Sequence, residues 1–254
     1  MHLDVLPLPP EPGSALLDGR TCLVVDVLRA TSSMAVLLAS GIEAIYPAGS
    51  IEEGRSRREG LEGTLGRRVL LCGERHALPP EGYDFGNSPS ELAEALGGED
   101  PEWREAVVAT TNGTRALLAC RAARLVLAAA PLNAAAATQH ALDAGDDVLV
   151  VCSGTDGQPS DDDYLAAGLL VDRLVAGGAD VNEGAPGTLD ALDARERYRA
   201  VATDLGAAFA SVGHGRRLIE LGFGHDLAFC AEADRFAVAG SMRIENGVPV
   251  LRAL

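Results

Sequence analysis

The residues best suited to chemistry occur in four short polar segments, each following an apolar run of strand length. The segments are residues 26–31, 73–75, 111–115 and 153–157. Arginines and the backbone N–H groups of Gly-, Asn- and Thr-containing turns hold phosphate, sulfonate or carboxylate oxygens. Asp26 and Glu74 suit a hard cation such as Mg²⁺, which bridges carboxylates to an anionic ligand. We therefore expect a metal-assisted site that handles phosphoryl groups.

An α/β sheet would bring these segments together. Apolar runs alternate with helical patterns, which is typical of α/β folds. The predicted strands cover residues 22–27, 44–47, 69–72, 106–110, 125–129 and 148–152, and the predicted helices cover 33–40, 50–60, 88–96, 114–122, 133–144 and 160–176. Because the carboxyl ends of parallel strands share one edge, the polar segments should converge on one crevice. We expect a three-layer α/β/α fold with a mostly parallel or mixed sheet.

The pattern is looser after residue 180. Residues 180–189 indicate a loop, and helices are predicted over 192–212 and near 216–221. Residues 227–230 and 236–239 resemble strands, and Asn246-Gly247 is typical of a hairpin turn. We expect a single domain over 1–254. Within it, the part from about residue 180 is a candidate for a separately packed lobe.

The charge balance excludes several classes of protein. The 254 residues include 21 basic and 37 acidic side chains, a net charge of −16, which disfavours nucleic acid and anionic membranes as partners. All 21 basic residues are Arg, so mechanisms that need a P-loop, Schiff-base or kinase lysine are excluded.

The cysteines and the N-terminal segment bear on the compartment. Five cysteines without a C-x-x-C pair predict reduced, mostly buried thiols. The N-terminal residues do not have the pattern of a signal peptide, and no apolar window is long enough for a membrane span. We expect a cytoplasmic protein.

The polar segments also have ordinary structural explanations. Asp26 could cap the following helix or pair with Arg29, and Glu74 with Arg75 could form a surface ion pair of little energetic value. Acidic residues at 161–163 would complement the dipole of a helix first turn.

Two alternatives to a metal-assisted phosphatase follow from other residues. Cys152 ends a strand and could be the nucleophile of a different hydrolase, although a buried structural thiol is commoner. The same loops could also form a sensor that binds a phosphorylated or sulfonated metabolite without turnover. His214 and His225 stand alone near glycines and do not have metal-ligand spacing.

Five segments together resemble one family, the 2-phosphosulfolactate phosphatases of coenzyme M biosynthesis. They are VVDVLRATSS (24–33), GERHALPPEGYDFGNSPSE (73–91), TTNGTRAL (110–117), VCSGTDGQPSDDDYLAAG (151–168) and GHGRRLIELGFGHDLAFCAEAD (213–234). The resemblance implies a Mg²⁺-dependent phosphate monoester hydrolase with a three-layer α/β/α fold, which converts 2-phosphosulfolactate to 3-sulfolactate and phosphate. This chain departs from the family at His76-Ala77, where Gly is frequent, and at Asp162-Asp163, where Glu-Asp is found.

The loop chemistry and the resemblance together define a candidate site. The predicted catalytic residues are Asp26, Arg29, Glu74 and Arg75. The predicted substrate-binding residues are Asn87, Ser88, Asn112, Gly113, Thr114, Arg115, Ser153, Gly154 and Thr155. The predicted Mg²⁺ ligands are Asp26 and Glu74, with Asp84 and Asp163 as further candidates. The expected partner is a small anionic phosphomonoester, and the apolar composition is compatible with a homo-oligomer.

Overall fold

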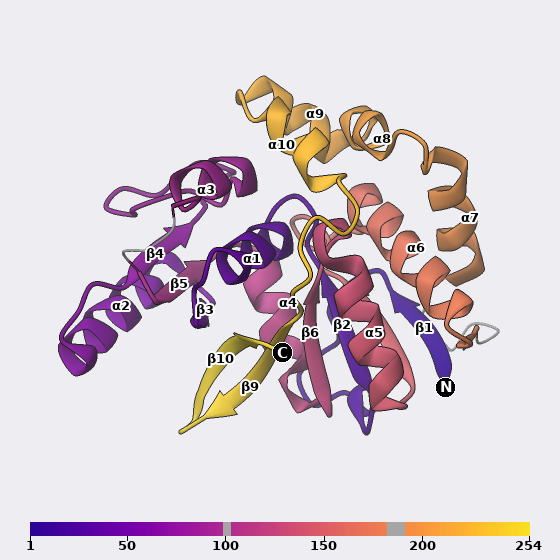
Figure 1. Ribbon diagram of the computed structural model, residues 1–254, viewed down its shortest axis with the longest axis horizontal. Coiled ribbons are helices and arrows are strands. Elements are labelled where there is room, and N and C mark those ends of the chain that lie inside the picture. Colours follow the sequence, from indigo (N-terminus) through magenta and orange to yellow (C-terminus); the bar gives the residue numbers. More distant parts are fainter. Residues whose placement is uncertain (99–102, 182–190) are drawn as a thin grey trace.

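The computed structural model describes residues 1–98, 103–181 and 191–254, which form a ten-stranded mixed sheet and the helices around it (Figure 1). The strand order is β4-β5-β3-β10-β9-β6-β2-β7-β1-β8. The strands are β1 (His2–Leu6), β2 (Thr21–Val25), β3 (Ala44–Ala48), β4 (Leu70–Gly73), β5 (Glu105–Ala109), β6 (Leu125–Ala129), β7 (Val148–Cys152), β8 (Asp180–Val181), β9 (Gly240–Glu245) and β10 (Val248–Ala253).

The sheet consists of two parallel blocks joined by a hairpin. Strands β4, β5 and β3 pair in parallel, and so do β6, β2, β7, β1 and β8. The β9–β10 hairpin lies between the blocks and pairs antiparallel with β3 on one side and β6 on the other. Asn246 and Gly247 adopt positive φ at its turn, as the sequence predicts.

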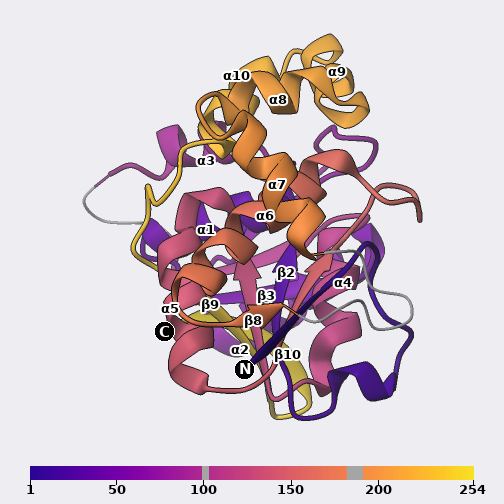
Figure 2. The ribbon, with the colours of Figure 1, turned by 90° about the vertical axis from the view of Figure 1, so that its right-hand side faces the viewer.

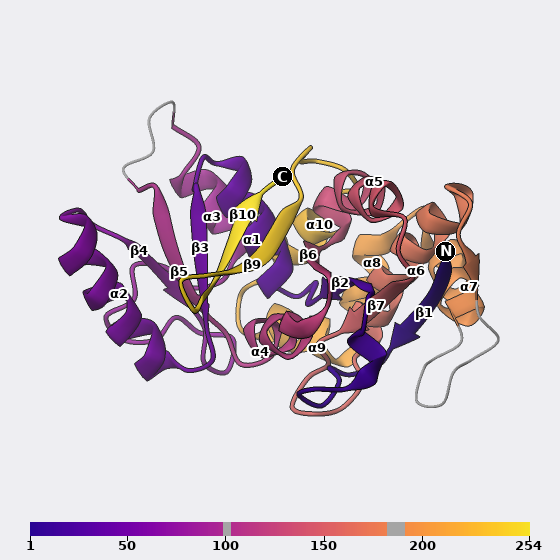
Figure 3. The same ribbon diagram turned by 90° about the horizontal axis from the view of Figure 1, so that it is seen from below.

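Helices cover both faces of the sheet. They are α1 (Ala30–Ala39), α2 (Ile51–Leu65), α3 (Pro89–Ala95), α4 (Gly113–Ala119), α5 (Ala134–Ala144), α6 (Asp161–Ala176), α7 (Ala191–Val201), α8 (Leu205–Ser211), α9 (Gly213–Glu220) and α10 (Gly224–Cys230). Figure 3 shows α4 and α5 on opposite sides of β6 and β2. Strand β2 is buried on both faces: Leu23 and Val25 pack in one apolar cluster, and Cys22 and Val24 in another. The predicted three-layer α/β/α architecture is therefore confirmed.

Helices α7 to α10 form a cap at one end of the sheet. Figure 2 shows α8, α9 and α10 above the sheet and α7 beside α6. Apolar residues of this cap, including Leu205, Phe209 and Leu218, belong to the same buried cluster as those of α5 and α6. The cap is thus joined to the sheet layers through a shared core.

The sequence prediction was wrong at several places in the C-terminal region. Residues 227–230 lie in helix α10, because a four-residue apolar run fits a buried helix as well as a strand. Residues 236–239 are in no strand, and the helix predicted over 192–212 is two helices, with Asp204 capping α8. Strand β1, outside this region, was not predicted either. Of the predicted loop at 180–189, Asp180–Val181 form β8, and residues 182–189 lie outside the described residues.

The predictions for the central elements were closer. The strands at 125–129 and 148–152 are confirmed as predicted, and the other four differ from the structure by one or two residues at their ends. Ser88 caps α3 by accepting a hydrogen bond from the Glu91 N–H, and Pro89 occupies the first helical position. None of the helices in the described residues is long and apolar enough to cross a membrane.

Candidate active site

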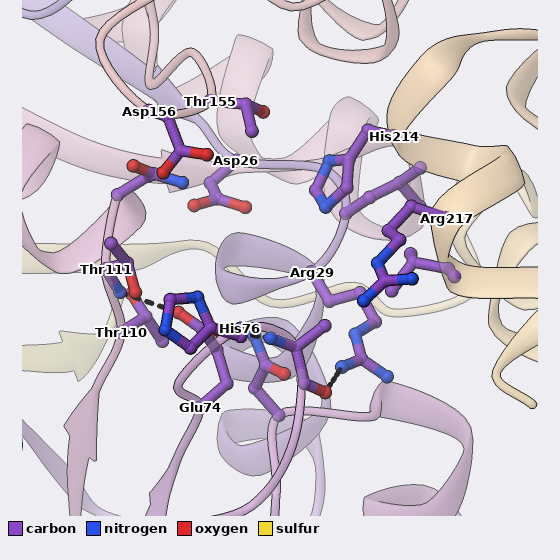
Figure 4. Close-up of a pocket in the computed structure, with 15 residues that line it drawn as sticks. Asp26, Arg29, Glu74, His76, Thr110, Thr111, Thr155, Asp156, His214 and Arg217 are labelled. Carbon is purple, nitrogen blue, oxygen red and sulfur yellow. Dashed lines mark hydrogen bonds between the residues drawn. The ribbon is translucent and has the colours of Figure 1, made fainter. Parts of the chain in front are cut away.

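A pocket of about 300 Å³ lies where the loops after β2, β4, β5 and β7 meet the capping helix α9 (Figure 4). Its lining residues are Asp26, Leu28, Arg29, Glu74, His76, Ala77, Asn87, Thr110, Thr111, Asn112, Thr155, Asp156, His214, Arg217 and Leu218. The four polar segments therefore converge, but the two strand blocks do not run in one direction. Three successive antiparallel pairings, β3–β10, β10–β9 and β9–β6, give the two blocks opposite strand directions.

Asp26 is both a helix cap and a pocket carboxylate. Its Oδ1 accepts a hydrogen bond of 3.1 Å from the Ala30 N–H, so the capping explanation is correct. Its backbone exchanges two hydrogen bonds with the Thr31 hydroxyl, which fixes the turn into α1. Burial raises the pKa of Asp26 from 3.8 to about 6, although the Ala30 N–H opposes this shift. Asp26 thus presents a poorly solvated carboxylate to the pocket.

Arg29 is part of the pocket wall, with its terminal nitrogens bonded to protein. Nη1 donates to Asp226 Oδ2 at 2.7 Å and Nη2 donates to the Ala77 carbonyl at 2.7 Å. The guanidinium lies 4.2 Å from the centre of the Phe223 ring. Both members of the Arg29–Asp226 pair are buried. Arg29 therefore joins three segments of the wall, and Asp226, not Asp26, compensates its charge.

Glu74 holds two loops together from the opposite side of the pocket. Its Oε1 accepts from the Thr111 N–H at 2.7 Å, and its Oε2 accepts from the Ala77 N–H at 2.9 Å. His76 and Ala77 adopt φ of 55° and 67°. Only glycine reaches this left-handed conformation without steric cost, so these two residues strain the backbone at this turn.

Arg75 and Arg115 do not line the main pocket. Both are exposed and line an adjoining groove of about 340 Å³ at the N-terminal end of α2. This groove shares Glu74, His76 and Thr111 with the main pocket. The structure thus places Arg75 beside the main pocket rather than in it, and the two arginines offer positive charge there.

The predicted substrate-binding residues divide into two groups. Asn87, Asn112 and Thr155 line the pocket. Asn87 is only 4% exposed, and its Oδ1 has no hydrogen-bond partner among the described residues. Because a buried amide oxygen without a partner is unfavourable, this atom indicates a place for a bound donor or cation.

Four further residues of the predicted substrate-binding set have structural roles. Ser88 donates to Asp226, and Thr114 bonds to Thr110. The N–H groups of Ser153 and Gly154 donate to Asp163 and not into the pocket. In this structure these groups of the four residues bond to protein partners.

Gly113 supports the site through its lack of a side chain. A Cβ at this position would lie 2.6 Å from Asp26 Oδ2 and 2.5 Å from the Ala30 Cβ. Both distances are too short for a real contact, so only glycine allows the start of α4 to pack against Asp26.

Asp163 and Asp84 are not at the pocket, contrary to their prediction as metal ligands. Asp163 accepts hydrogen bonds from the Val27, Ser153 and Gly154 N–H groups and from the Ser153 hydroxyl. It therefore ties the loop after β7 to the loop after β2. Asp84 accepts a hydrogen bond from the Leu71 N–H and pairs with Arg58 and Arg68. Its oxygens therefore bind groups beside the edge strand β4.

Four ionisable pocket residues were missing from the sequence-based site: His76, Asp156, His214 and Arg217. His214 and Arg217 come from α9, and the described structure places His214 Nδ1 3.2 Å from Asp162 Oδ2. The signal for the two α9 residues was the fifth resembling segment, GHGRRLIELGFGHDLAFCAEAD, whereas Asp156 lies in the fourth. Asp162, the partner of His214, is 52 residues away in the sequence, so no local sequence pattern indicates this pair.

Cys152 does not have the surroundings of a nucleophile. It is 1% exposed and is absent from the lining of the main pocket. Burial raises the pKa of its thiol well above the ordinary value, and the charges of Asp163 and Asp162 raise it further. A thiolate is therefore disfavoured, and the structure argues against a hydrolase that uses Cys152.

The similarity to known proteins extends over most of the chain. A family model described as 2-phosphosulpholactate phosphatase matches residues 9–243. A protein of Thermotoga petrophila named probable 2-phosphosulfolactate phosphatase is 36% identical over 252 residues, which are 98% of each chain. A protein of Deinococcus radiodurans with the same name is 37% identical over 235 residues, 91% of this chain and 88% of its own. A third, from Carboxydothermus hydrogenoformans, is 30% identical over 254 residues, 100% of this chain and 98% of its own.

Proposed function

The chain belongs to the 2-phosphosulfolactate phosphatase family, and we propose that it hydrolyses 2-phosphosulfolactate to 3-sulfolactate and phosphate with the help of Mg²⁺. The observation that carries this proposal is the composition of the pocket. The buried carboxylate of Asp26 lines it together with cationic side chains of α9 and with Asn87, whose Oδ1 has no hydrogen-bond partner among the described residues. This combination suits a metal cation and a phosphate together.

The pocket fits a partly hydrated Mg²⁺ rather than a metal enclosed by protein. In the described ranges, no three His, Cys, Asp or Glu side chains form a complete metal cage. Mg²⁺ usually keeps several waters and needs only one or two carboxylates together with substrate phosphate. Asp26 and Glu74 would hold it, and Asn87 Oδ1 would supply a neutral oxygen. Bound there, Mg²⁺ would neutralise charge on the phosphoryl group.

The remaining polar groups would bind and orient the substrate. Thr111, Asn112 and Thr155 offer donors around the pocket, and Arg217 adds a charge that is only loosely paired with Glu220 at 3.3 Å. The sulfonate and carboxylate of the substrate extend away from the phosphate. The adjoining groove, with Arg75 and Arg115, would attract these groups, because arginine binds both oxyanions well.

Phosphate release from 2-phosphosulfolactate, phosphoglycolate and 2-phospholactate, each with Mg²⁺ and then with EDTA, tests the proposal. We expect metal-dependent release that is fastest from the sulfonated ester. Substituting both groove arginines, Arg75→Ala and Arg115→Ala, should raise KM for the sulfonated ester more than for phosphoglycolate, which lacks the sulfonate. Release only from the non-sulfonated esters would contradict the assignment of 2-phosphosulfolactate as the substrate. Binding of the esters without release of phosphate from any of them would contradict a hydrolase and favour a sensor.

A further inference from the structure

One histidine of the pocket has a buried carboxylate partner and no role in the proposed function so far. His214 lies in the first turn of α9, and its side chain is 21% exposed. Its Nδ1 is 3.2 Å from Asp162 Oδ2. Figure 4 shows the imidazole ring pointing into the pocket from the side of α9, towards Asp26 on the opposite wall.

Asp162 is well placed to fix the orientation of this ring. Its side chain is 2% exposed, and the Ser160 hydroxyl donates to its other oxygen. A carboxylate bonded to one ring nitrogen holds that nitrogen in its N–H form and aims the other nitrogen away. Within the described residues, His214 Nε2 has no hydrogen-bond partner. The second nitrogen is therefore available to a molecule in the pocket.

The charges around His214 favour its protonated form. Burial by itself would lower the pKa of His214, but the hydrogen bond and charge of Asp162 and the charge of Asp26 raise it above the ordinary value. Arg29 opposes this effect, and Arg217 lies one turn further along the same helix. The balance favours an imidazolium that can release a proton.

Hydrolysis of an alkyl phosphate needs such a proton. The leaving group is an alkoxide, a strong base, and negative charge develops on its oxygen as the bond to phosphorus breaks. Arginine does not release its proton in proteins, and this chain has no Lys. His76, the other histidine of the pocket, is exposed and has no carboxylate partner in the described structure. His214 is thus the best-placed acid.

Resting on the proposed phosphatase function, we propose that His214 is the general acid for the leaving oxygen and that Asp162 is its positioning residue. The bond from phosphorus to the attacking water oxygen forms as the bond to the substrate C2 oxygen breaks. The proton on Nε2 moves to the C2 oxygen, which leaves an alcohol and a neutral imidazole. The water keeps one proton in the hydrogen phosphate product, and its other proton returns through solvent to His214.

A series of alkyl and aryl phosphates tests this assignment. Aryl leaving groups are weak bases that need little protonation. We expect His214→Gln to lower kcat/KM for alkyl esters by about 10²- to 10⁴-fold and for aryl esters much less. Asp162→Asn should show the same selective loss, about 10- to 100-fold. His140→Gln, on α5 and away from the pocket, is the matched control and should change neither rate.

The possible outcomes separate this inference from the function on which it rests. Equal losses for alkyl and aryl esters would show that His214 only binds substrate or supports the fold, and unchanged rates would remove it from the reaction. Either result would overturn the inference and leave the phosphatase intact. If the wild-type protein hydrolyses no ester of the series, the proposed function itself fails. Circular dichroism and urea unfolding of each variant show whether the fold is retained.

Discussion

Replacing Asp26 with Asn should stabilise the metal-free protein while abolishing turnover. Asp26 is 7% exposed, and burial raises its pKa from 3.8 to about 6. Each pKa unit corresponds to ~1.36 kcal/mol, so keeping this carboxylate ionised in the folded state costs about 3 kcal/mol. Asn is uncharged and has nearly the same shape, and its amide oxygen can still accept from the Ala30 N–H.

The pH dependence of this effect follows from the direction of the pKa shift. Below pH 3.8 the carboxyl group is protonated in both states and costs nothing. Between pH 3.8 and about 6 the unfolded chain releases the proton and the folded chain retains it, so wild-type stability falls as pH rises. The advantage of Asp26→Asn should therefore grow from under about 1 kcal/mol at pH 4 to about 3 kcal/mol at pH 8.

Urea unfolding of both proteins in EDTA at pH 4 and pH 8 measures this difference, and repeating it with Mg²⁺ tests the metal. A ligand that binds only the folded state stabilises it, by about 2.7 kcal/mol at a hundred times its Kd. Wild type should gain this stabilisation and Asp26→Asn should not. Asp84→Asn, outside the pocket, should keep the Mg²⁺ response although it weakens the ion pairs with Arg58 and Arg68. An Asp26→Asn variant that is less stable than wild type at pH 8 in EDTA would refute the burial argument.

Other substitutions and reagents test the walls of the pocket. Asp226→Asn leaves the buried Arg29 charge without its counter-charge and should cost about 3–5 kcal/mol in urea unfolding, whereas an effect near zero would contradict the wall assignment. Gly113→Ala places a methyl group against Asp26 and should lower kcat about 10²-fold with little change in the circular dichroism spectrum. Iodoacetamide should not inactivate the folded enzyme, because all five cysteines are buried. Rapid inactivation would instead support a hydrolase with a cysteine nucleophile.

The sequence was most informative about the central strands and the loops that follow them. Apolar runs of strand length and turn residues are local signals, so the convergence of Asp26, Glu74 and Asn112 could be expected. The role of each polar side chain was harder to assign. Asp163 and Asp26 both lie in loop-to-helix segments, but one accepts four hydrogen bonds from protein groups and the other faces the pocket. This difference depends on which neighbours surround each carboxylate after folding.

The contribution of α9 was not predictable for a related reason. His214 has no metal-ligand spacing and no nearby catalytic partner in the sequence. Its partner Asp162 is 52 residues earlier in the chain and was interpreted as a helix-dipole residue. The direction of the two strand blocks was also missed, because the antiparallel β9–β10 hairpin that separates them comes from the end of the chain.

The position of that hairpin affects how the protein can be synthesised. In the described structure, β9 and β10 lie in the middle of the sheet, although they follow all of its other strands in the sequence. The edge strands of the two blocks, β3 and β6, therefore have no sheet partner on their facing sides until this hairpin has been synthesised. Contacts between such distant parts of a chain form slowly, because closing the long intervening loop costs entropy. A nascent chain without the hairpin would leave both of these strand edges unpaired and open to aggregation and proteolysis.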